Sequence, residues 1–154
     1  EAFVPVKGRM SVKHLDNGLH LIDDTYNANP SSMAQALHVL HQLAGSNHGI
    51  AVLADMLELG EQTLLHHRQV GHLVAETAPA KLLLFGTQVS QIREGAIERG
   101  YPDAHIVMGS KQELADIIKD ETKHENWVLL KGSRGMAMET LIPILEQLPA
   151  EKAD

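Results

Sequence analysis

Short apolar runs alternate along this chain with longer segments in which apolar residues recur every three or four positions. The short runs cover residues 19–22, 50–54, 82–85, 105–108 and 128–130. The periodic segments predict helices over about 30–43 and 61–77, a third ending at Gly100, a fourth around 114–118 and a last one around 138–145. Strands that alternate with helices are typical of βαβ units. The pattern therefore predicts an α/β domain of three layers, in which helices cover both faces of a mostly parallel sheet.

The chain departs from this alternation at both ends. Residues 11–14 and 19–22 flank the tetrapeptide 15–18, whose Asn17-Gly18 pair is a strong hairpin signal. We therefore expect an N-terminal antiparallel hairpin whose second strand belongs to the main sheet. Near the other end, Pro143 lies inside the last helical segment, and we expect it to kink or delay that helix.

The composition is that of an ordinary globular domain, and it excludes several functions. The 154 residues are enough for one domain with a core, and 44% of them are hydrophobic. The formal net charge of −7 argues against broad nucleic-acid binding, which needs a basic surface. No cysteine is present and no run approaches roughly 18 apolar residues, so we expect neither thiolate chemistry nor membrane insertion. Because the chain begins at Glu1, we expect it to be a piece of a longer protein.

The segment DDTYNANP at residues 23–30 is the most informative part of the chain. It joins a predicted strand to a predicted helix, and ligands of open α/β sheets bind where strands end and helices begin. A helix-start signal alone would account for Asn29 as N-cap and Pro30 as first helical residue. It would not account for the two aspartates, Tyr26 and Asn27, so we favour a ligand loop.

Two further polar clusters follow predicted strands. Asp55 is expected at the end of the strand 50–54, and Glu58 and Glu61 either belong to a site or only complement the dipole of the next helix. Residues 131–135 (KGSRG) combine two cations, a hydroxyl and two glycines, which suits a carboxylate or phosphate. The alternative is a tight turn with solvated cations. The order of a phosphate-binding P-loop is absent from the chain.

The ten histidines do not indicate a metal site. Those on the first two predicted helices lack a carboxylate at the spacing of a zinc motif, so we expect solvated helix positions: His38, His41, His66, His67 and His72.

Four motifs occur in order along the chain: DDTYNANP at 23–30, VLADMLELGE at 52–61, HRQVG at 67–71 and LKGSRGM at 130–136. Together they resemble the C-terminal domain of the Mur ligases, and within that family the members that add D-alanyl-D-alanine. The likeness extends over nearly the whole chain and implies one Rossmann-like domain over residues 1–154. Ala54 departs from the pattern, because the family usually has glycine there.

The resemblance implies a stepwise amide ligation in the cytoplasm. ATP, with Mg²⁺, would phosphorylate the carboxylate of UDP-N-acetylmuramoyl-tripeptide, and the amine of D-alanyl-D-alanine would displace the phosphate. The UDP-binding and ATP-binding domains that hold most of these ligands would be other parts of the same enzyme. This domain would close over the nucleotide and position the dipeptide without supplying a catalytic residue or a metal ligand. Alone it is expected to be inactive.

The resemblance also assigns residues. It implies that Arg9 reaches the nucleotide phosphates and Asp24 the ribose hydroxyls, within a nucleotide-binding set of Arg9, Asp24, Tyr26, Asn27, Asn29 and Pro30. The dipeptide or the tripeptide carboxylate would face Lys131, Ser133 and Arg134, with Asp55, Gly86 and Thr87 as further candidates. His67 would be structural.

Two other functions remain open from the residues alone. The chain suits a non-catalytic nucleotide- or anion-binding module. It also resembles superficially an acidic receiver-like pocket, with Asp23, Asp24 and Asp55 at strand ends and Lys131 after a later strand.

Overall fold

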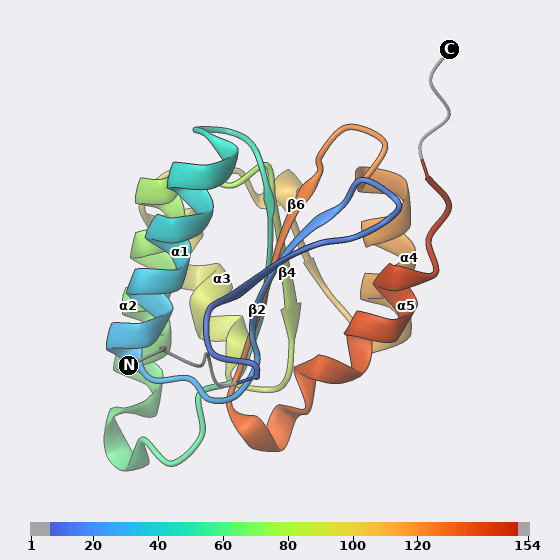
Figure 1. Ribbon diagram of the computed structural model, residues 1–154. Coiled ribbons are helices and arrows are strands. Elements are labelled where there is room, and N and C mark those ends of the chain that lie inside the picture. Colours follow the sequence, from blue (N-terminus) through green and yellow to red (C-terminus); the bar gives the residue numbers. More distant parts are fainter. Residues whose placement is uncertain (1–6, 151–154) are drawn as a thin grey trace, which may run out of the picture.

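A six-stranded sheet forms the centre of the computed structural model, which describes residues 7–150 (Figure 1). The strand order is β1-β2-β6-β3-β4-β5, with β1 antiparallel to β2 and every other neighbouring pair parallel. The strands are β1 (Ser11–His14), β2 (His20–Asp24), β3 (Ile50–Ala54), β4 (Lys81–Phe85), β5 (Ile106–Met108) and β6 (Trp127–Lys131). The predicted mostly parallel sheet with an N-terminal hairpin is confirmed.

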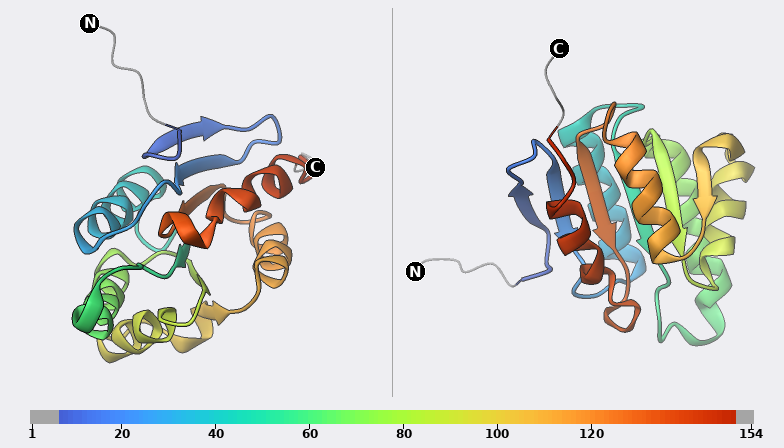
Figure 2. Two further views of the ribbon diagram at one scale, coloured as in Figure 1. Left: turned by 90° about the horizontal axis from the view of Figure 1, so that it is seen from below. Right: turned by 90° about the vertical axis from the view of Figure 1, so that its right-hand side faces the viewer.

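Helices cover both faces of this sheet (Figure 2). One face packs against α1 (Pro30–Ala44), α2 (Thr63–Thr77) and α3 (Val89–Glu98). The other face packs against α4 (Lys111–Glu121), the short helix α5 (Ile142–Glu146) and the 3₁₀ turn η4 (Met138–Leu141). Two apolar clusters, one on each face, therefore make up the core, as expected for strands buried on both sides.

Element boundaries differ from the predictions by a few residues where the backbone tightens. The helix expected from residue 61 begins as a 3₁₀ turn, η1 (Gly60–Gln62), and becomes α-helical at Thr63. His105 belongs to the 3₁₀ turn η2 (Asp103–His105) and not to the strand that follows. The expected delay at Pro143 is confirmed, because α5 starts only at Ile142 and places this proline in its first turn.

The hairpin register brings residues 7–10 to the carboxyl end of β2. Ser11 of β1 pairs with Asp23 of β2, so the residues just before β1 lie beside the carboxyl end of β2. At the other end of the hairpin, the Asn17 side chain accepts from Leu19 N and donates to the carbonyls of Leu145 and Leu148. The turn is thereby tied to the last turn of α5 and to the chain just after it.

The connections after neighbouring strands run to opposite faces at β6. β2 and β3 are followed by α1 and α2 on one face, whereas β6, which lies between them, leads to η4 and α5 on the other. Such a reversal leaves room for a ligand beyond the carboxyl ends of the strands. The candidate residues after β2, β3 and β6 all lie at this end of the sheet.

Candidate functional site

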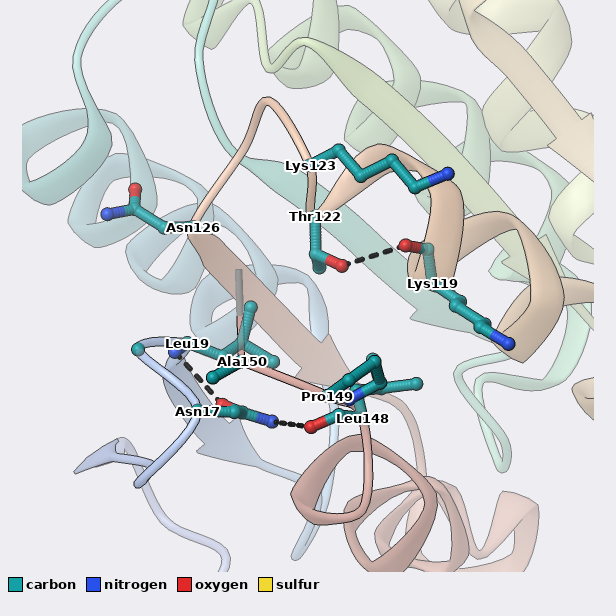
Figure 3. Close-up of a pocket in the computed structure, with 10 residues that line it drawn as sticks. Asn17, Leu19, Lys119, Thr122, Lys123, Asn126, Leu148, Pro149 and Ala150 are labelled. Carbon is teal, nitrogen blue, oxygen red and sulfur yellow. Dashed lines mark hydrogen bonds between the residues drawn. The ribbon is translucent and has the colours of Figure 1, made fainter. Parts of the chain in front are cut away.

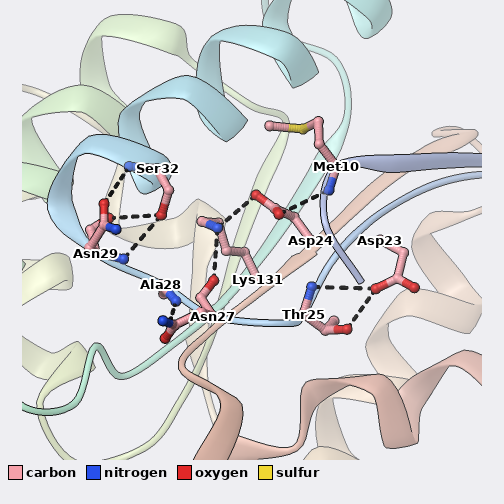
Figure 4. Close-up of polar contacts among 9 residues, drawn as sticks. All are labelled: Met10, Asp23, Asp24, Thr25, Asn27, Ala28, Asn29, Ser32 and Lys131. Carbon is pink, nitrogen blue, oxygen red and sulfur yellow. Dashed lines mark hydrogen bonds and ion pairs between the residues drawn. The ribbon is translucent and has the colours of Figure 1, made fainter. Parts of the chain in front are cut away.

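A buried ion pair joins the ends of β2 and β6 (Figure 4). The Lys131 ammonium donates to Asp24 Oδ2 at 2.6 Å and to the Asn27 carbonyl at 3.0 Å. Lys131 is 1% exposed and Asp24 7% exposed. Burial lowers the pKa of Lys131, and the Asp24 carboxylate partly offsets that effect. These two acceptors occupy two of the three donors of the ammonium.

Asp24 also holds the turn that carries Arg9. Its Oδ1 accepts from Met10 N at 3.0 Å, and on the other side of Arg9 the Gly8 carbonyl accepts from Tyr26 N at 2.8 Å. Gly8 (φ 81°) and Met10 (φ 46°) both adopt left-handed backbone conformations, which for a methionine must be held by its surroundings. Arg9 therefore projects from a turn fixed on both sides.

Two arginine side chains share one aromatic ring at this end of the sheet. The guanidinium carbon of Arg9 lies 4.2 Å from the centroid of the Tyr26 ring, and that of Arg134 lies 5.0 Å from it. Both arginines are exposed and Tyr26 is half-buried. No side chain among residues 7–150 forms an ion pair with either guanidinium. The arrangement presents two cations to an anionic ligand.

The rest of the 23–30 segment stabilises its own loop and the start of α1. Asn29 is the N-cap, with its side chain accepting from Ser32 N at 2.8 Å in a reciprocal capping box, and Pro30 opens the helix as predicted. Asp23 accepts from the Thr25 hydroxyl at 2.6 Å and lies 3.4 Å from the Lys13 ammonium. These contacts fix the backbone that carries Tyr26 and Asn27.

The cluster after β3 is built differently. The Asp55 carboxylate accepts four hydrogen bonds, from the backbone N–H groups of Thr87, Gln88 and Val89 and from the Thr87 hydroxyl, at 2.9–3.3 Å. An ionised carboxylate offers about four lone-pair sites. Gly86 has a φ of 129°, and a Cβ there would lie 2.4 Å from Asp55 Oδ1. Asp55, Gly86 and Thr87 thus contact one another and anchor the start of α3.

Ser133 and His67 tie the loop after β3 to its neighbours. Ser133 donates its N–H to the Asp55 carbonyl at 3.0 Å, and its hydroxyl accepts from Leu57 N at 2.7 Å. Nε2 of His67 accepts from Met56 N at 3.0 Å, while Nδ1 donates to the Thr63 carbonyl at 2.7 Å. The expectation of solvated histidines is wrong for His67, which is completely buried and acts as a structural bridge. Glu58 and Glu61 are both exposed, and Glu61 lies in the first turn of η1 without making a capping hydrogen bond.

The structure therefore separates the predicted residues into two groups. Arg9, Asp24, Tyr26, Asn27, Lys131 and Arg134 come together at β2 and β6, whereas Asp55, Gly86, Thr87 and Ser133 lock the loops after β3 and β4. A receiver-like pocket is not formed, because Asp24 faces Lys131 while Asp55 faces the start of α3. The sequence reasoning missed the backbone of Met10 as a partner of Asp24; the only signal was a glycine directly before Arg9.

Neither a metal site nor a large pocket coincides with these residues. Within residues 7–150 no three His, Asp or Glu side chains lie so that they could together hold a metal ion. No helix in the same range is long and apolar enough to cross a membrane.

A pocket of about 450 Å³ lies at the opposite end of the sheet, near the amino ends of β2 and β6 (Figure 3). Asn17, Lys119 and Leu148 are among its lining residues, and none of the predicted site residues is. In Figure 3 the ammonium groups of Lys119 and Lys123 point away from Asn17, so no charged group converges on the pocket.

Comparison with known proteins agrees with this fold. The family model described as "Mur ligase, glutamate ligase domain" matches residues 8–134, so the chain belongs to the Mur ligase family.

The relatives are named for one activity within that family. The chain is 30% identical, over 92% of its length, to UDP-N-acetylmuramoyl-tripeptide--D-alanyl-D-alanine ligase of Bacillus subtilis, of which it covers 31%. Among solved structures, MurF from Acinetobacter baumannii superposes with a TM-score of 0.79 at 31% identity, over 92% of this chain and 31% of that one. MurF ligase from Thermotoga maritima in complex with ADP has the same fold, with a TM-score of 0.77 at 23% identity, over 95% of this chain and 32% of that one. The chain thus spans about a third of the length of the relatives it matches.

Proposed function

We propose that this chain is the C-terminal domain of a cytoplasmic, ATP-dependent amide ligase that adds D-alanyl-D-alanine to UDP-N-acetylmuramoyl-tripeptide in peptidoglycan precursor synthesis. The single observation that carries the proposal is that Arg9 and Arg134 meet at Tyr26, at the reversal point of the sheet. A fold hosts many functions, so the site must support the assignment. The names of the relatives and the ADP bound to the T. maritima ligase support the same choice.

On the nucleotide side, Arg9 contacts the phosphates and Asp24 the ribose hydroxyls. Each Asp24 oxygen accepts one protein hydrogen bond, so each keeps a lone pair for a further donor. Tyr26, Asn27, Asn29 and Pro30 line the same side, with Tyr26 and Asn27 offering side chains while Asn29 and Pro30 hold the start of α1. In this proposal, magnesium is held mainly by the remaining domains of the enzyme.

On the substrate side, Arg134 is the group that meets the dipeptide or the tripeptide carboxylate. Lys131 and Ser133 act at shorter range inside the protein, since the lysine faces Asp24 and the serine hydroxyl faces Leu57 N. An indirect role, through fixing the start of α3, falls to Asp55, Gly86 and Thr87.

The chemistry needs positioning from this domain and no nucleophile. The tripeptide carboxylate attacks the terminal phosphorus of ATP. The bond between that phosphorus and the ADP oxygen breaks, and ADP leaves. The dipeptide amine then attacks the acyl carbon, loses a proton, and phosphate leaves as the C–N bond forms. Closing the domain over the reactants aligns them and keeps water away from the acyl phosphate, which water would otherwise hydrolyse.

Complementation in trans tests the proposal. The chain is mixed with the remaining domains of the B. subtilis relative, ATP, Mg²⁺, UDP-N-acetylmuramoyl-tripeptide and D-alanyl-D-alanine, and phosphate release is measured. We expect phosphate release that depends on the dipeptide and requires the chain. Arg9→Gln should lower the rate of this release about a hundredfold, because a contact to phosphate is lost. The matched control is Arg99→Gln, which changes an exposed arginine at the C-cap of α3 and should leave the rate unchanged.

The same assay contains the outcomes that contradict the proposal. The chain alone should release no phosphate in response to the dipeptide. Ligation by the chain alone, or release that is insensitive to Arg9→Gln once the domains are shown to associate, would refute the assigned role.

A further inference from the structure

We propose that Tyr26 joins Arg9 and Arg134 into one clamp for a ligand that carries two neighbouring oxyanions. The inference rests on the proposed function for the identity of that ligand, but the clamp itself is a property of three side chains. The two arginines come from opposite ends of the described chain, one just before β1 and one just after β6, and meet only at the Tyr26 ring.

The distances limit the separation of the two guanidinium carbons to about 9 Å. Each lies within 5.0 Å of the same ring centroid, so their separation cannot exceed the sum of the two distances. A planar aromatic ring attracts a cation toward its face, and Arg is the cation most often found there. Tyr26 therefore offsets part of the repulsion between the two positive charges.

Two of the other arginines pair with carboxylates, whereas Arg99, like Arg9 and Arg134, forms no ion pair within residues 7–150. Arg9 and Arg134 differ from Arg99 because they share one aromatic ring. Arg68 pairs with Glu98 and Arg93 with Asp103, each at 2.8 Å. The chain has an excess of acidic residues, yet no carboxylate among residues 7–150 pairs with Arg9 or Arg134. Two cations kept together without an internal anion are arranged for an external one.

Both arginines project from backbone that the protein holds in place. Arg9 lies between Gly8, whose carbonyl accepts from Tyr26 N, and Met10, whose N–H donates to Asp24. Arg134 follows Ser133, whose N–H and hydroxyl are both engaged with the loop after β3. Because the two guanidiniums are positioned in advance, a ligand that engages both gains more than one that engages either.

The chemistry of the clamp indicates the class of ligand. A guanidinium binds a carboxylate or a phosphate through two parallel hydrogen bonds, so two of them suit one molecule with two such groups a few bonds apart. Diphosphates have this character, and so does a phosphoryl group beside a carboxyl group. In the proposed ligase, the second description fits the phosphoryl group at the moment it joins the tripeptide carboxylate. Tyr26 is then a positioning residue, and Arg9 and Arg134 belong to one subsite instead of two.

The test compares inorganic pyrophosphate with inorganic phosphate as probes of the purified chain, at constant ionic strength, by calorimetry and amide NMR shifts. We expect pyrophosphate to bind at least about tenfold more tightly than phosphate, since it can engage both arginines at once. Tyr26→Phe keeps the ring and should keep this ratio within about twofold. Tyr26→Leu, Arg9→Gln and Arg134→Gln should each bring the ratio close to one, and the control Arg99→Gln should not change it.

Two results would overturn the clamp. One is a pyrophosphate preference that persists in Tyr26→Leu; the other is additive losses in the Arg9→Gln/Arg134→Gln double variant, which would mean independent sites. If Tyr26→Leu does not fold by NMR, the arginine cycle alone decides the question. If the unchanged chain supports ligation in trans but does not prefer pyrophosphate over phosphate, only the clamp is refuted. If it prefers pyrophosphate but does not support ligation, only the proposed function is refuted.

Discussion

The carboxyl ends of β2 and β6 carry polar residues similar to those at the carboxyl end of β3, but the two regions use them in different ways. At β2 and β6, Asp24 and Lys131 neutralise each other in the interior, and Arg9 and Arg134 remain exposed beyond them. At β3, Asp55 directs all of its acceptor capacity to the start of α3. In this protein, an acidic residue at a strand end therefore marks the candidate ligand site only where charged side chains nearby remain exposed and unpaired within the described part of the chain.

The largest effect should come from breaking the buried ion pair. Lys131→Met leaves Asp24 buried without its cation, and we expect a loss of about 3–5 kcal/mol in the free energy of unfolding by urea. The double variant Asp24→Asn/Lys131→Met should recover most of that loss. The exposed pair of Arg93 and Asp103 is the control, where Arg93→Met should change the free energy by less than about 1 kcal/mol. Equal effects at the two pairs would contradict the buried character of the first.

The lowered pKa of Lys131 adds a pH dependence with a definite sign. Between that lowered pKa and the ordinary value of 10.5, the unfolded chain binds more protons than the folded chain. The free energy of unfolding should therefore rise with pH across this window, relative to the Asp24→Asn/Lys131→Met variant, and the gain should be lost as the pH falls through the folded-state pKa. A difference that falls with pH in this window would show that the attraction of Asp24 outweighs the effect of burial.

The region after β3 should also lose stability when its buried charge is removed, but without an effect on ligand binding. Asp55→Asn turns an amide N–H toward backbone donors and leaves a buried N–H of α3 without a partner, which should cost about 3 kcal/mol in urea unfolding. Pyrophosphate binding should stay as in the unchanged chain, because Asp55 has no free acceptor for a ligand. Lost binding without lost stability would instead make Asp55 a ligand contact.

A smaller effect should come from the close approach between β3 and β6. A Cβ on Gly132 would lie 2.6 Å from the Ala54 Cβ, so Gly132→Ala should destabilise the chain by about 1–3 kcal/mol through overpacking. Gly132→Ala combined with Ala54→Gly should restore most of the loss, because the second change removes the Cβ that the first would meet. Thermal unfolding of the cycle measures the coupling, and additive effects would contradict it.

The smallest expected effect tests the tie between the two regions. Ser133→Ala removes the acceptor of Leu57 N and should cost about 1 kcal/mol. Amide hydrogen exchange should accelerate at Leu57 and leave the backbone near Tyr26 unchanged. Faster exchange in both places would show that the regions open as one unit.

Much of the fold was predictable because its signals are local. Apolar spacing indicated the strands and helices, Asn17-Gly18 indicated the hairpin, and Asn29-Pro30 indicated the start of α1. The errors lie where local signals are weak, as at the 3₁₀ turn η1. The burial of His67 was missed because its partner, Met56 N, belongs to a loop whose path the local sequence does not specify.

The amino-acid sequence by itself determined the order of the elements, the parallel sheet and the concentration of polar residues at the strand ends, since these depend on spacing along the chain. Only the tertiary structure decided which polar atoms remain available. The order β2-β6-β3 places Lys131 against Asp24, and the β4–α3 turn reaches Asp55. Hydrogen-bonding capacity is then consumed by partners that are remote in sequence, and Arg9 and Arg134 are left together on Tyr26 because no such partner reaches them within residues 7–150.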